Sequence, residues 1–258
     1  MTQHNKKNVA HSIFQRLLNR AKINREDFNL LLSRYGMERF LYRLSISPHN
    51  DRFILKGASL FLVWTGQNYR VTRDADFLGL GNPDLEILTD IFCDICGVEC
   101  KNDGMVYNSE SLNVGEIREG QEYDGVRITL VGLLNHARIP LQIDIGFGDT
   151  VTPAPEDIEY PTLFDAPSPR LKAYPRYTLV AEKLEAMLKL GLANSRMKDF
   201  YDIWLLSKIF SFEGDVLRMA IKNTFNQRHT PLPVSTPLEG FHQKVKTRCS
   251  GWEPIFRY

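Results

Sequence analysis

Apolar residues recur every three or four positions over most of the first 44 residues. The run from Phe28 to Leu44 follows this spacing, which is that of one face of an α-helix. The pattern predicts helices over 11–21 and 25–44, and Pro48 ends it because proline cannot continue a helix. The same periodicity predicts further helices over 85–96, 178–192, 197–209 and 214–226.

The middle of the chain carries strand signals in place of helical ones. Short apolar or β-branched runs bounded by turn residues are typical of strands. Such runs lie at 52–55, 74–80, 126–133 and 139–147. Because only a short polar turn separates the last two runs, we expect them to form an antiparallel pair.

Two further segments complete the expected architecture. Residues 58–64 follow Gly57 and predict a helix directly after the first strand, whereas residues 153–175 are rich in proline and predict an irregular crossover. The fold class is therefore α/β (α+β), with strands in the middle and helices on both sides. We expect residues 1–152 to form N-terminal helices plus a core, and residues 153–258 to form the crossover and a C-terminal helical lobe.

Composition adds little to this picture. The chain has 258 residues, of which 43% are apolar and 24% charged, as in an ordinary soluble globular protein. The formal net charge of +1 neither favours nor excludes a nucleic-acid partner, because local charge placement decides that. The sequence contains neither an apolar run of the ~20 residues that span a bilayer nor the apolar core of a signal peptide. We therefore expect a cytoplasmic protein without a membrane partner.

Four cysteines do not suggest a disulfide scaffold in a chain of this size. Cys93 and Cys96 have the C-x-x-C spacing of a zinc site, with Cys100 and the distant Cys249 as further thiolates. The alternative, which we favour, is that they are small buried residues of the helix predicted over 85–96.

The first candidate for chemistry is the acidic pair Asp74 and Asp76. Alternate residues of a strand project to the same side, so the two carboxylates are expected to lie together. Two carboxylates at this spacing repel each other unless a cation lies between them, and hard oxygen ligands suit Mg²⁺. Taken alone, the pair could equally be a solvated feature of an edge strand.

A glycine motif precedes this pair. Lys56, Gly57 and Ser59 stand where the first strand runs into a helix. A helix start presents free backbone N–H groups, and a serine adds a hydroxyl, so this turn could bind a phosphate. The alternative is an ordinary strand-to-helix turn.

A third acid, Asp144, interrupts an apolar strand. Leu141, Ile143, Ile145 and Phe147 share the face that should be core, and Asp144 lies on the other face. Beside Asp74 and Asp76 it would complete a two-metal site, which activates an attacking hydroxyl and neutralises a leaving pyrophosphate. It would then be the natural general base. The alternative is a salt bridge from Asp144 to a lysine or arginine.

The last candidates lie on the C-terminal helices. Lys183 lies outside the apolar stripe of its helix and could reach a nucleotide triphosphate, although a solvated lysine is the commoner outcome. Asp199 and Asp202 are three residues apart and should share a helix face, with Lys198 nearby. Acids favoured by the helix dipole are the alternative.

Together these motifs resemble the AbiEii/AbiGii toxin family of nucleotidyltransferases over nearly the whole chain. The resemblance depends on the order and spacing of the segments 25–44, 53–57, 70–76, 135–149, 181–183 and 196–202. It implies a DNA-polymerase-β-like nucleotidyltransferase core with a mixed sheet, flanked by an N-terminal helical segment and a C-terminal helical lobe.

The resemblance also implies roles for single residues. Asp74 and Asp76 would be ligands of Mg²⁺ or Mn²⁺, Lys183 would bind nucleotide or act in catalysis, and Asp199 would be an essential acid. The general base therefore stays open between Asp144 and Asp199, with Asp144 favoured as the third carboxylate of the metal site. The residues expected to bind the nucleotide are Lys56, Gly57, Ser59, Arg73, Lys183 and Lys198.

Two positions depart from the family pattern. The first motif often reads Gly-Ser or Gly-Gly, whereas here Ala58 follows Gly57 and the serine stands one place later. The third motif usually has a glutamate six residues before the lysine, and here Tyr177 occupies that place. Glu182 is the nearest substitute for the missing carboxylate.

The activity implied is that of a toxin from a toxin–antitoxin pair of the phage-defence type. It would transfer NMP from an NTP to an RNA acceptor, the 3′ end of tRNA, and so block translation. The expected partners are the NTP, the tRNA and a cognate antitoxin protein. Two alternatives are the same chemistry on a protein or small-molecule hydroxyl (AMPylase-like), and a non-catalytic member that binds RNA or a partner.

Overall fold

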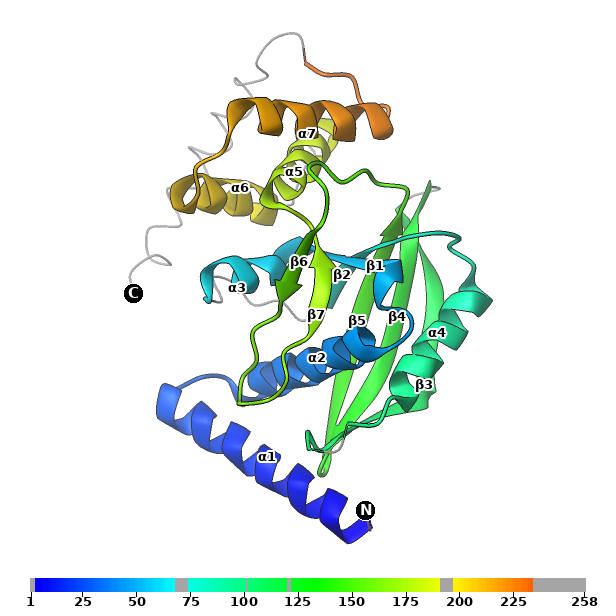
Figure 1. Cartoon of the computed structure of the whole chain (residues 1–258), viewed down its shortest axis with the longest axis vertical. Helices are drawn as coiled ribbons and strands as arrows, with labels where there is room; N and C mark the ends of the chain where they lie inside the picture. Colours follow the sequence, from blue (N-terminus) through cyan, green and yellow to red (C-terminus); the bar gives the residue numbers. More distant parts are fainter. Residues whose placement is uncertain (1–2, 68–73, 101, 120–121, 191–196, 234–258) are drawn as a thin grey trace. The chain divides into compact units, whose positions relative to one another are not determined.

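The computed structural model describes residues 3–67, 74–100, 102–119, 122–190 and 197–233 (Figure 1). The chain divides into two compact units. The first unit comprises residues 1–149 and 154–174, and the second comprises residues 150–153 and 175–258.

The first unit is built on a seven-stranded sheet of order β3-β4-β5-β2-β1-β7-β6. The β2–β5 and β1–β7 pairs are parallel, whereas the other neighbouring pairs are antiparallel. The predicted α/β class with a mixed sheet is therefore confirmed. The strands are β1 (Phe53–Lys56), β2 (Asp74–Gly79), β3 (Met105–Glu119), β4 (Glu122–Leu134), β5 (Ala137–Phe147), β6 (Glu156–Glu159) and β7 (Arg170–Ala173).

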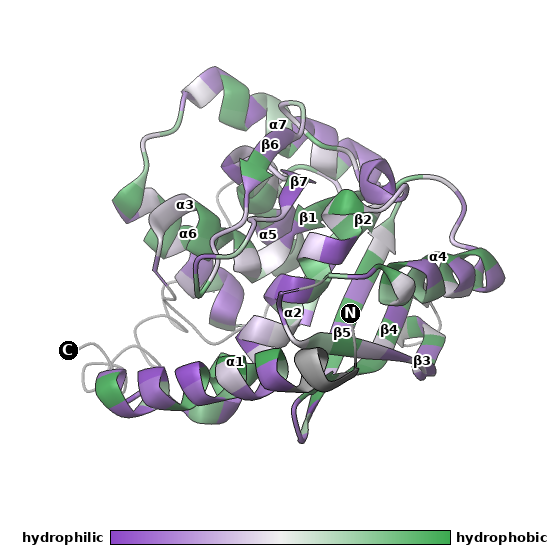
Figure 2. Cartoon of the chain, turned by 60° about the horizontal axis from the view of Figure 1, so that its bottom comes forward, coloured by the Kyte–Doolittle hydropathy of each residue, from purple (hydrophilic) through white to green (hydrophobic). Residues whose placement is uncertain are grey.

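Helices pack against one face of this sheet, with α2 (Phe28–Ile46) crossing it over β5 (Figure 1). Gly36 lets the helix approach closely, because a Cβ at that position would lie only 2.9 Å from Cγ2 of Ile139. α4 (Leu85–Gly97) packs on β3, and α1 (Gln3–Asn24) packs on α2. Hydrophobic and hydrophilic residues alternate along α1 and α4 (Figure 2), as expected for helices that bury one side.

The pattern of β5 shows how the sheet separates a core face from an open one. Ile139, Leu141, Ile143 and Ile145 are buried, while the residues between them are exposed or partly buried. This alternation follows from the two-residue period of a strand. The face opposite the helices is thereby left to the intervening polar residues, Asp144 among them.

Most predicted elements of the first unit are present, one prediction was wrong and one strand was missed. The 126–133 and 139–147 runs do pair antiparallel, as β4 and β5. The crossover over 153–175 is not irregular, because β6 and β7 lie within it; each has only four residues, too few to show a period. β3 was not predicted at all, because its register against β4 shifts between Asn108 and Asn113, which breaks the alternation.

The second unit is helical in the part that the structure describes. It contains α5 (Arg176–Leu190), α6 (Met197–Ile209) and α7 (Gly214–Gln227). Tyr177 and Ala181 of α5 pack on Ala220 of α7, and the Tyr177 ring meets Phe212 edge to face at 5.3 Å between centroids. This confirms the predicted C-terminal helices. No helix in the described ranges is both long and apolar enough to cross a bilayer.

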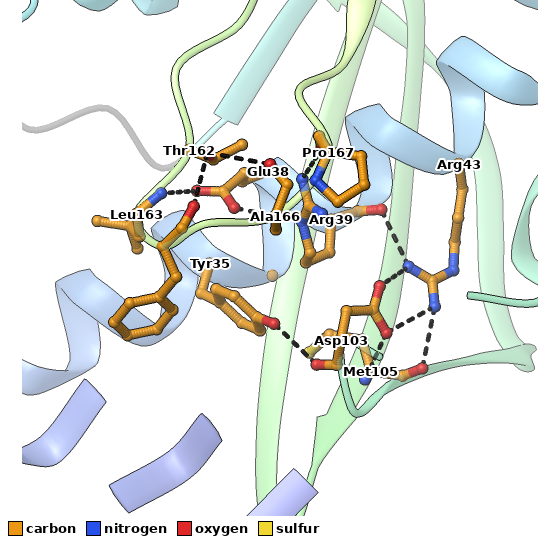
Figure 3. A network of polar contacts seen from close by, with 12 residues as sticks. Tyr35, Glu38, Arg39, Arg43, Asp103, Met105, Thr162, Leu163, Ala166 and Pro167 are labelled. Atoms are coloured by element: carbon orange, nitrogen blue, oxygen red, sulfur yellow. Dashed lines mark hydrogen bonds and ion pairs between the residues drawn. The ribbon is translucent and has the colours of Figure 1, made fainter. Parts of the chain in front are cut away.

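A buried polar network joins α2 to the rest of the first unit (Figure 3). The Arg43 guanidinium donates to the Asp103 carboxylate at 2.6 and 3.2 Å and to the carbonyl of Met105. Glu38 accepts from the backbone N–H of Leu163 at 2.7 Å, and Arg39 donates to the carbonyl of Pro167. α2 thus holds both the segment before β3 and the segment before β7.

Glu38 is fully buried in this network. Burial raises the pKa of its carboxyl to about 7, although the neighbouring Arg39 and the N–H of Leu163 lower it. A carboxyl with a raised pKa in the folded state binds its proton more tightly there than in the unfolded chain. Its contribution to stability is therefore largest at low pH and decreases as the pH rises.

We predict that Glu38→Gln removes a pH dependence from the free energy of unfolding. In the wild type this residue should lower that free energy by on the order of 2 kcal/mol between about pH 4.5 and 7. The amide of the variant still accepts the Leu163 bond but does not titrate. Urea unfolding of both proteins across this range measures the difference, and parallel curves would contradict the prediction.

Candidate active site

The three predicted acids of the first unit meet on one face of the sheet. β2 lies parallel to β5 with Asp76 opposite Asp144 and Asp74 opposite Gln142. One carboxylate oxygen from each of Asp74, Asp76 and Asp144 lies within 4.8 Å of the others, and all three residues are partly buried. The structure thus brings together the cluster that the alternation along two separate strands predicted.

Buried neighbours fix these side chains on the open face. Ala75 and Phe77 flank Asp76 in β2, and Ile143 and Ile145 flank Asp144 in β5; all four are at most 1% exposed. Because successive side chains of a strand point to opposite faces, burying these four turns the acids the other way. A one-residue slip of either strand would bury a carboxylate, which is costly.

The donor set fits a hard divalent cation. Three carboxylates that can each offer an oxygen within one small volume are suited to Mg²⁺ or Mn²⁺, and a cation between them would relieve their mutual repulsion. Across the described ranges no other group of three histidine, cysteine or acidic residues has this geometry. Cys93, Cys96 and Cys100 are free thiols without such a cluster, and Cys249 lies outside the described residues.

Asp144 also makes the salt bridge that was its alternative interpretation. Arg127 of β4 lies directly opposite it and donates from Nε and Nη2 to its two oxygens at 2.8 and 2.7 Å. This bond to Asp144, helped by the charges of Asp74 and Asp76, raises the pKa of the Arg127 guanidinium. The amide of Gln142 reaches the same carboxylate at 3.2 Å.

Arg127 is a residue of this cluster that was not predicted from the sequence. The signal was present, because a two-residue turn at Asn135 and His136 fixes the register of the β4–β5 hairpin. Counting back from that turn places Arg127 beside Asp144. Asp144 thus belongs to the acidic cluster and also forms a salt bridge with Arg127 in this structure.

The glycine motif lies against the acids. Gly57 has φ +76°, and a Cβ there would overlap the Asp76 carboxylate. Lys56 donates to Asp149 at 3.1 Å and lies 5.6 Å from the Tyr174 ring centroid. Ser59 is buried and donates to the carbonyl of Lys56 at 3.3 Å.

The helix start after Gly57 is shorter than predicted. A 3-10 turn, Gly57–Ser59, leads into α3 (Leu60–Thr65), which has six residues. The Ser59 hydroxyl donates to the carbonyl of Lys56 in this structure, and its expected contact with a phosphate stays a prediction. What this motif supplies is close approach of the backbone to Asp76.

The C-terminal candidates form a cluster of their own in the second unit. Lys183 donates to Asp199 at 2.7 Å and pairs with Asp202 at 2.9 Å. The two acids are 3% and 1% exposed. Asp199 and Asp202 thus share a face of α6, as predicted, but Lys183 is held in a buried ion pair and is not a solvated lysine.

The remaining candidates fall in different surroundings. Lys198 is exposed in the first turn of α6, and Arg73 lies outside the described residues. Tyr177, which stands where the family has a glutamate, is a core residue whose hydroxyl accepts from the backbone N–H of Glu213. Glu182 pairs with Arg228 at 3.4 Å.

We predict that Gly57→Ala damages the site, whereas Gly66→Ala is milder. Both glycines have positive φ, +76° and +70°, but a Cβ at Gly66 would meet nothing within 4 Å. Each variant should lose about 1 kcal/mol of stability from backbone strain. Only Gly57→Ala should also displace Asp76 and weaken binding of Mn²⁺. Thermal unfolding and Mn²⁺ titration separate the two effects, and equal Mn²⁺ affinities would contradict the prediction.

We predict that Lys183→Met destabilises the second unit by about 3 kcal/mol, because it leaves Asp199 and Asp202 buried without this counter-charge. Urea unfolding measures the loss. The triple variant Lys183→Met, Asp199→Asn, Asp202→Asn should recover part of it. Unchanged stability of the single variant would show that the pair serves chemistry alone.

Comparison with known proteins identifies a family. The model of a family described as nucleotidyl transferase AbiEii toxin, type IV toxin–antitoxin system, matches residues 39–248. No curated protein matches the chain.

Solved structures that are similar to this chain include two from one bacterium. They are JHP933 from Helicobacter pylori and a candidate nucleotidyltransferase from the same bacterium, with TM-scores of 0.49 and 0.46. Each is 14% identical in sequence, and each alignment covers 88% of this chain and 98% of the other.

Proposed function

Because the chain belongs to the AbiEii family of nucleotidyltransferase toxins, we propose that it transfers NMP from an NTP to an RNA acceptor, the 3′ end of tRNA. Modified tRNA would no longer serve translation, and a cognate antitoxin protein would restrain the enzyme. The reaction joins the acceptor oxygen to the α-phosphorus and releases pyrophosphate.

The observation that carries this proposal is the cluster of Asp74, Asp76 and Asp144. Their oxygens lie within 4.8 Å of one another at the junction of two parallel strands. A bound Mg²⁺ or Mn²⁺ would favour deprotonation of the acceptor hydroxyl and screen the triphosphate charge. A protein that only bound anionic RNA would gain nothing from three carboxylates, because they repel phosphate.

The chain's own contribution to this chemistry is positioning. β2 and β5 fix the carboxylates on one face, and Gly57 keeps the backbone clear of Asp76. We assign Asp144 to the metal-site carboxylates. Lys56 is assigned to nucleotide binding because it ends β1 opposite Asp76.

Lys183 and Asp199 are the proposed contribution of the second unit. They contact each other at 2.7 Å between α5 and α6. The family assignment supports Lys183 as a nucleotide-binding or catalytic lysine and Asp199 as an essential acid. Asp144 and Asp199 are therefore the two candidates for the general base, and exposed Lys198 is a further phosphate contact.

The test is transfer of label from NTP to tRNA. Purified protein with Mg²⁺, each α-labelled NTP in turn and total bacterial tRNA should give a labelled tRNA band on a denaturing gel. Asp74→Asn should reduce labelling about 100-fold or more, because it weakens charge stabilisation worth several kcal/mol. Asp157→Asn is the matched control, since Asp157 is an exposed acid of β6 paired with Lys172.

Each other outcome would redirect the proposal. Label in a protein or small-molecule fraction would exclude the RNA acceptor and keep nucleotidyl transfer. No label in any fraction, with NTP binding intact, would indicate a non-catalytic member. Equal loss in Asp74→Asn and Asp157→Asn would remove the carboxylate cluster from the mechanism.

A further inference from the structure

Arg127 occupies both oxygens of the third carboxylate. Its Nε and Nη2 donate to Oδ1 and Oδ2 of Asp144 at 2.8 and 2.7 Å, the two-pronged geometry that guanidinium and carboxylate favour. A cation that binds Asp144 together with Asp74 and Asp76 needs at least one of these oxygens. Arg127 and the cation therefore compete for the same atoms.

Stability alone does not account for this arrangement. The Arg127 side chain is 48% exposed and that of Asp144 19%, so solvent screens part of the attraction and the pair contributes less to stability than a buried pair of the same geometry would. The same two strands already pair through their backbones from Val126–Ile145 to Leu134–Ala137. The guanidinium is instead placed where two further carboxylates, Asp74 and Asp76, add to the attraction.

An exposed arginine is also free to exchange partners. Its fork of N–H donors matches a phosphate as well as it matches a carboxylate. A nucleotide triphosphate brought to the acids would lie close to a guanidinium that is already there. The hydrogen bonds that Arg127 gives up at Asp144 would then be replaced by hydrogen bonds to a phosphate.

We propose that Arg127 is an exchangeable counter-cation of the acidic cluster. Without nucleotide it neutralises Asp144; when a metal-bound triphosphate arrives, it releases at least one Asp144 oxygen and binds a phosphate oxygen. This inference rests on the proposed function, because it assumes that the cluster binds a divalent cation and an NTP. It makes Arg127 oppose the free cation and favour the cation–nucleotide complex.

The experiment measures binding, without turnover. Mn²⁺ alone is titrated into the full chain and followed by electron paramagnetic resonance. Binding of each NTP carrying a non-hydrolysable α,β-methylene bridge is then measured by calorimetry at saturating Mn²⁺. The variants are Arg127→Gln, Arg127→Lys and the control Arg170→Gln. Arg170 forms the equivalent cross-strand pair, with Glu159 on β6 at 2.8 Å, on strands that do not carry the acids.

We expect Arg127→Gln to bind Mn²⁺ more tightly than the wild type, by up to about tenfold, because one competing positive charge is gone. It should bind the nucleotide analogue several-fold more weakly. Arg127→Lys keeps the positive charge without the forked N–H donors, so both of its affinities should lie between those of Arg127→Gln and the wild type. Arg170→Gln should match the wild type in both affinities. Thermal unfolding in EDTA checks that each variant is folded. If Arg127→Gln does not fold, the comparison is made with Arg127→Lys.

Two results would overturn the inference while leaving the cation site intact. Weaker or unchanged Mn²⁺ binding in Arg127→Gln would make Arg127 a positioning residue for Asp144. Tighter Mn²⁺ binding with unchanged nucleotide affinity would show that Arg127 does not move from Asp144 to a phosphate oxygen. A further variant, Asp74→Asn, tests the cation site itself. If it binds Mn²⁺ as tightly as the wild type does, the proposed function fails together with this inference. That failure is recognisable because no variant then differs from the wild type in Mn²⁺ affinity.

Discussion

Repulsion between three carboxylates is the constraint around which the first unit is organised. The parallel register of β2 and β5 places Asp76 opposite Asp144, so the sheet holds like charges together that would separate in a flexible chain. The buried residues between the acids provide the opposing force, because turning an acid inward would expose an apolar neighbour. Arg127 offsets part of the repulsion from a third strand. The cluster is thus held by packing on the opposite face of the sheet.

That packing depends in turn on α2. Gly36 brings the helix against Ile139 and Leu141, which lie on the strand that carries Asp144. The same helix holds the segment before β3 through Arg43 and Asp103, and the segment before β7 through Glu38. Removing one member of such a buried pair costs more than the pair contributes, because the partner remains charged in the core. The back of the sheet is therefore specified by polar contacts as well as by apolar ones.

Much of the fold could be predicted because the signals were local. The period of three and four residues gave the long helices, and alternation in β5 separated Asp144 from its buried neighbours. The misses share a physical cause. β3 contains a register shift. β7 pairs with β1, which is distant in sequence, and β6 is a four-residue edge strand that pairs with β7. The ion pair of Lys183 with Asp199 and Asp202 could not be predicted, because helical periodicity indicates which face of α5 the lysine is on and does not indicate that α6 places two acids there.

The position of Arg127 also bears on the order in which the chain can assemble. Arg127 and Asp144 lie in one hairpin closed by a two-residue turn, whereas β2 reaches β5 only after a long loop has closed. Short loops close faster and at lower entropic cost. The hairpin ion pair is therefore favoured to form first, and Asp144 meets Asp74 and Asp76 already neutralised. A residue beside the acidic cluster would in this way lower an electrostatic barrier to folding, before any ligand is present.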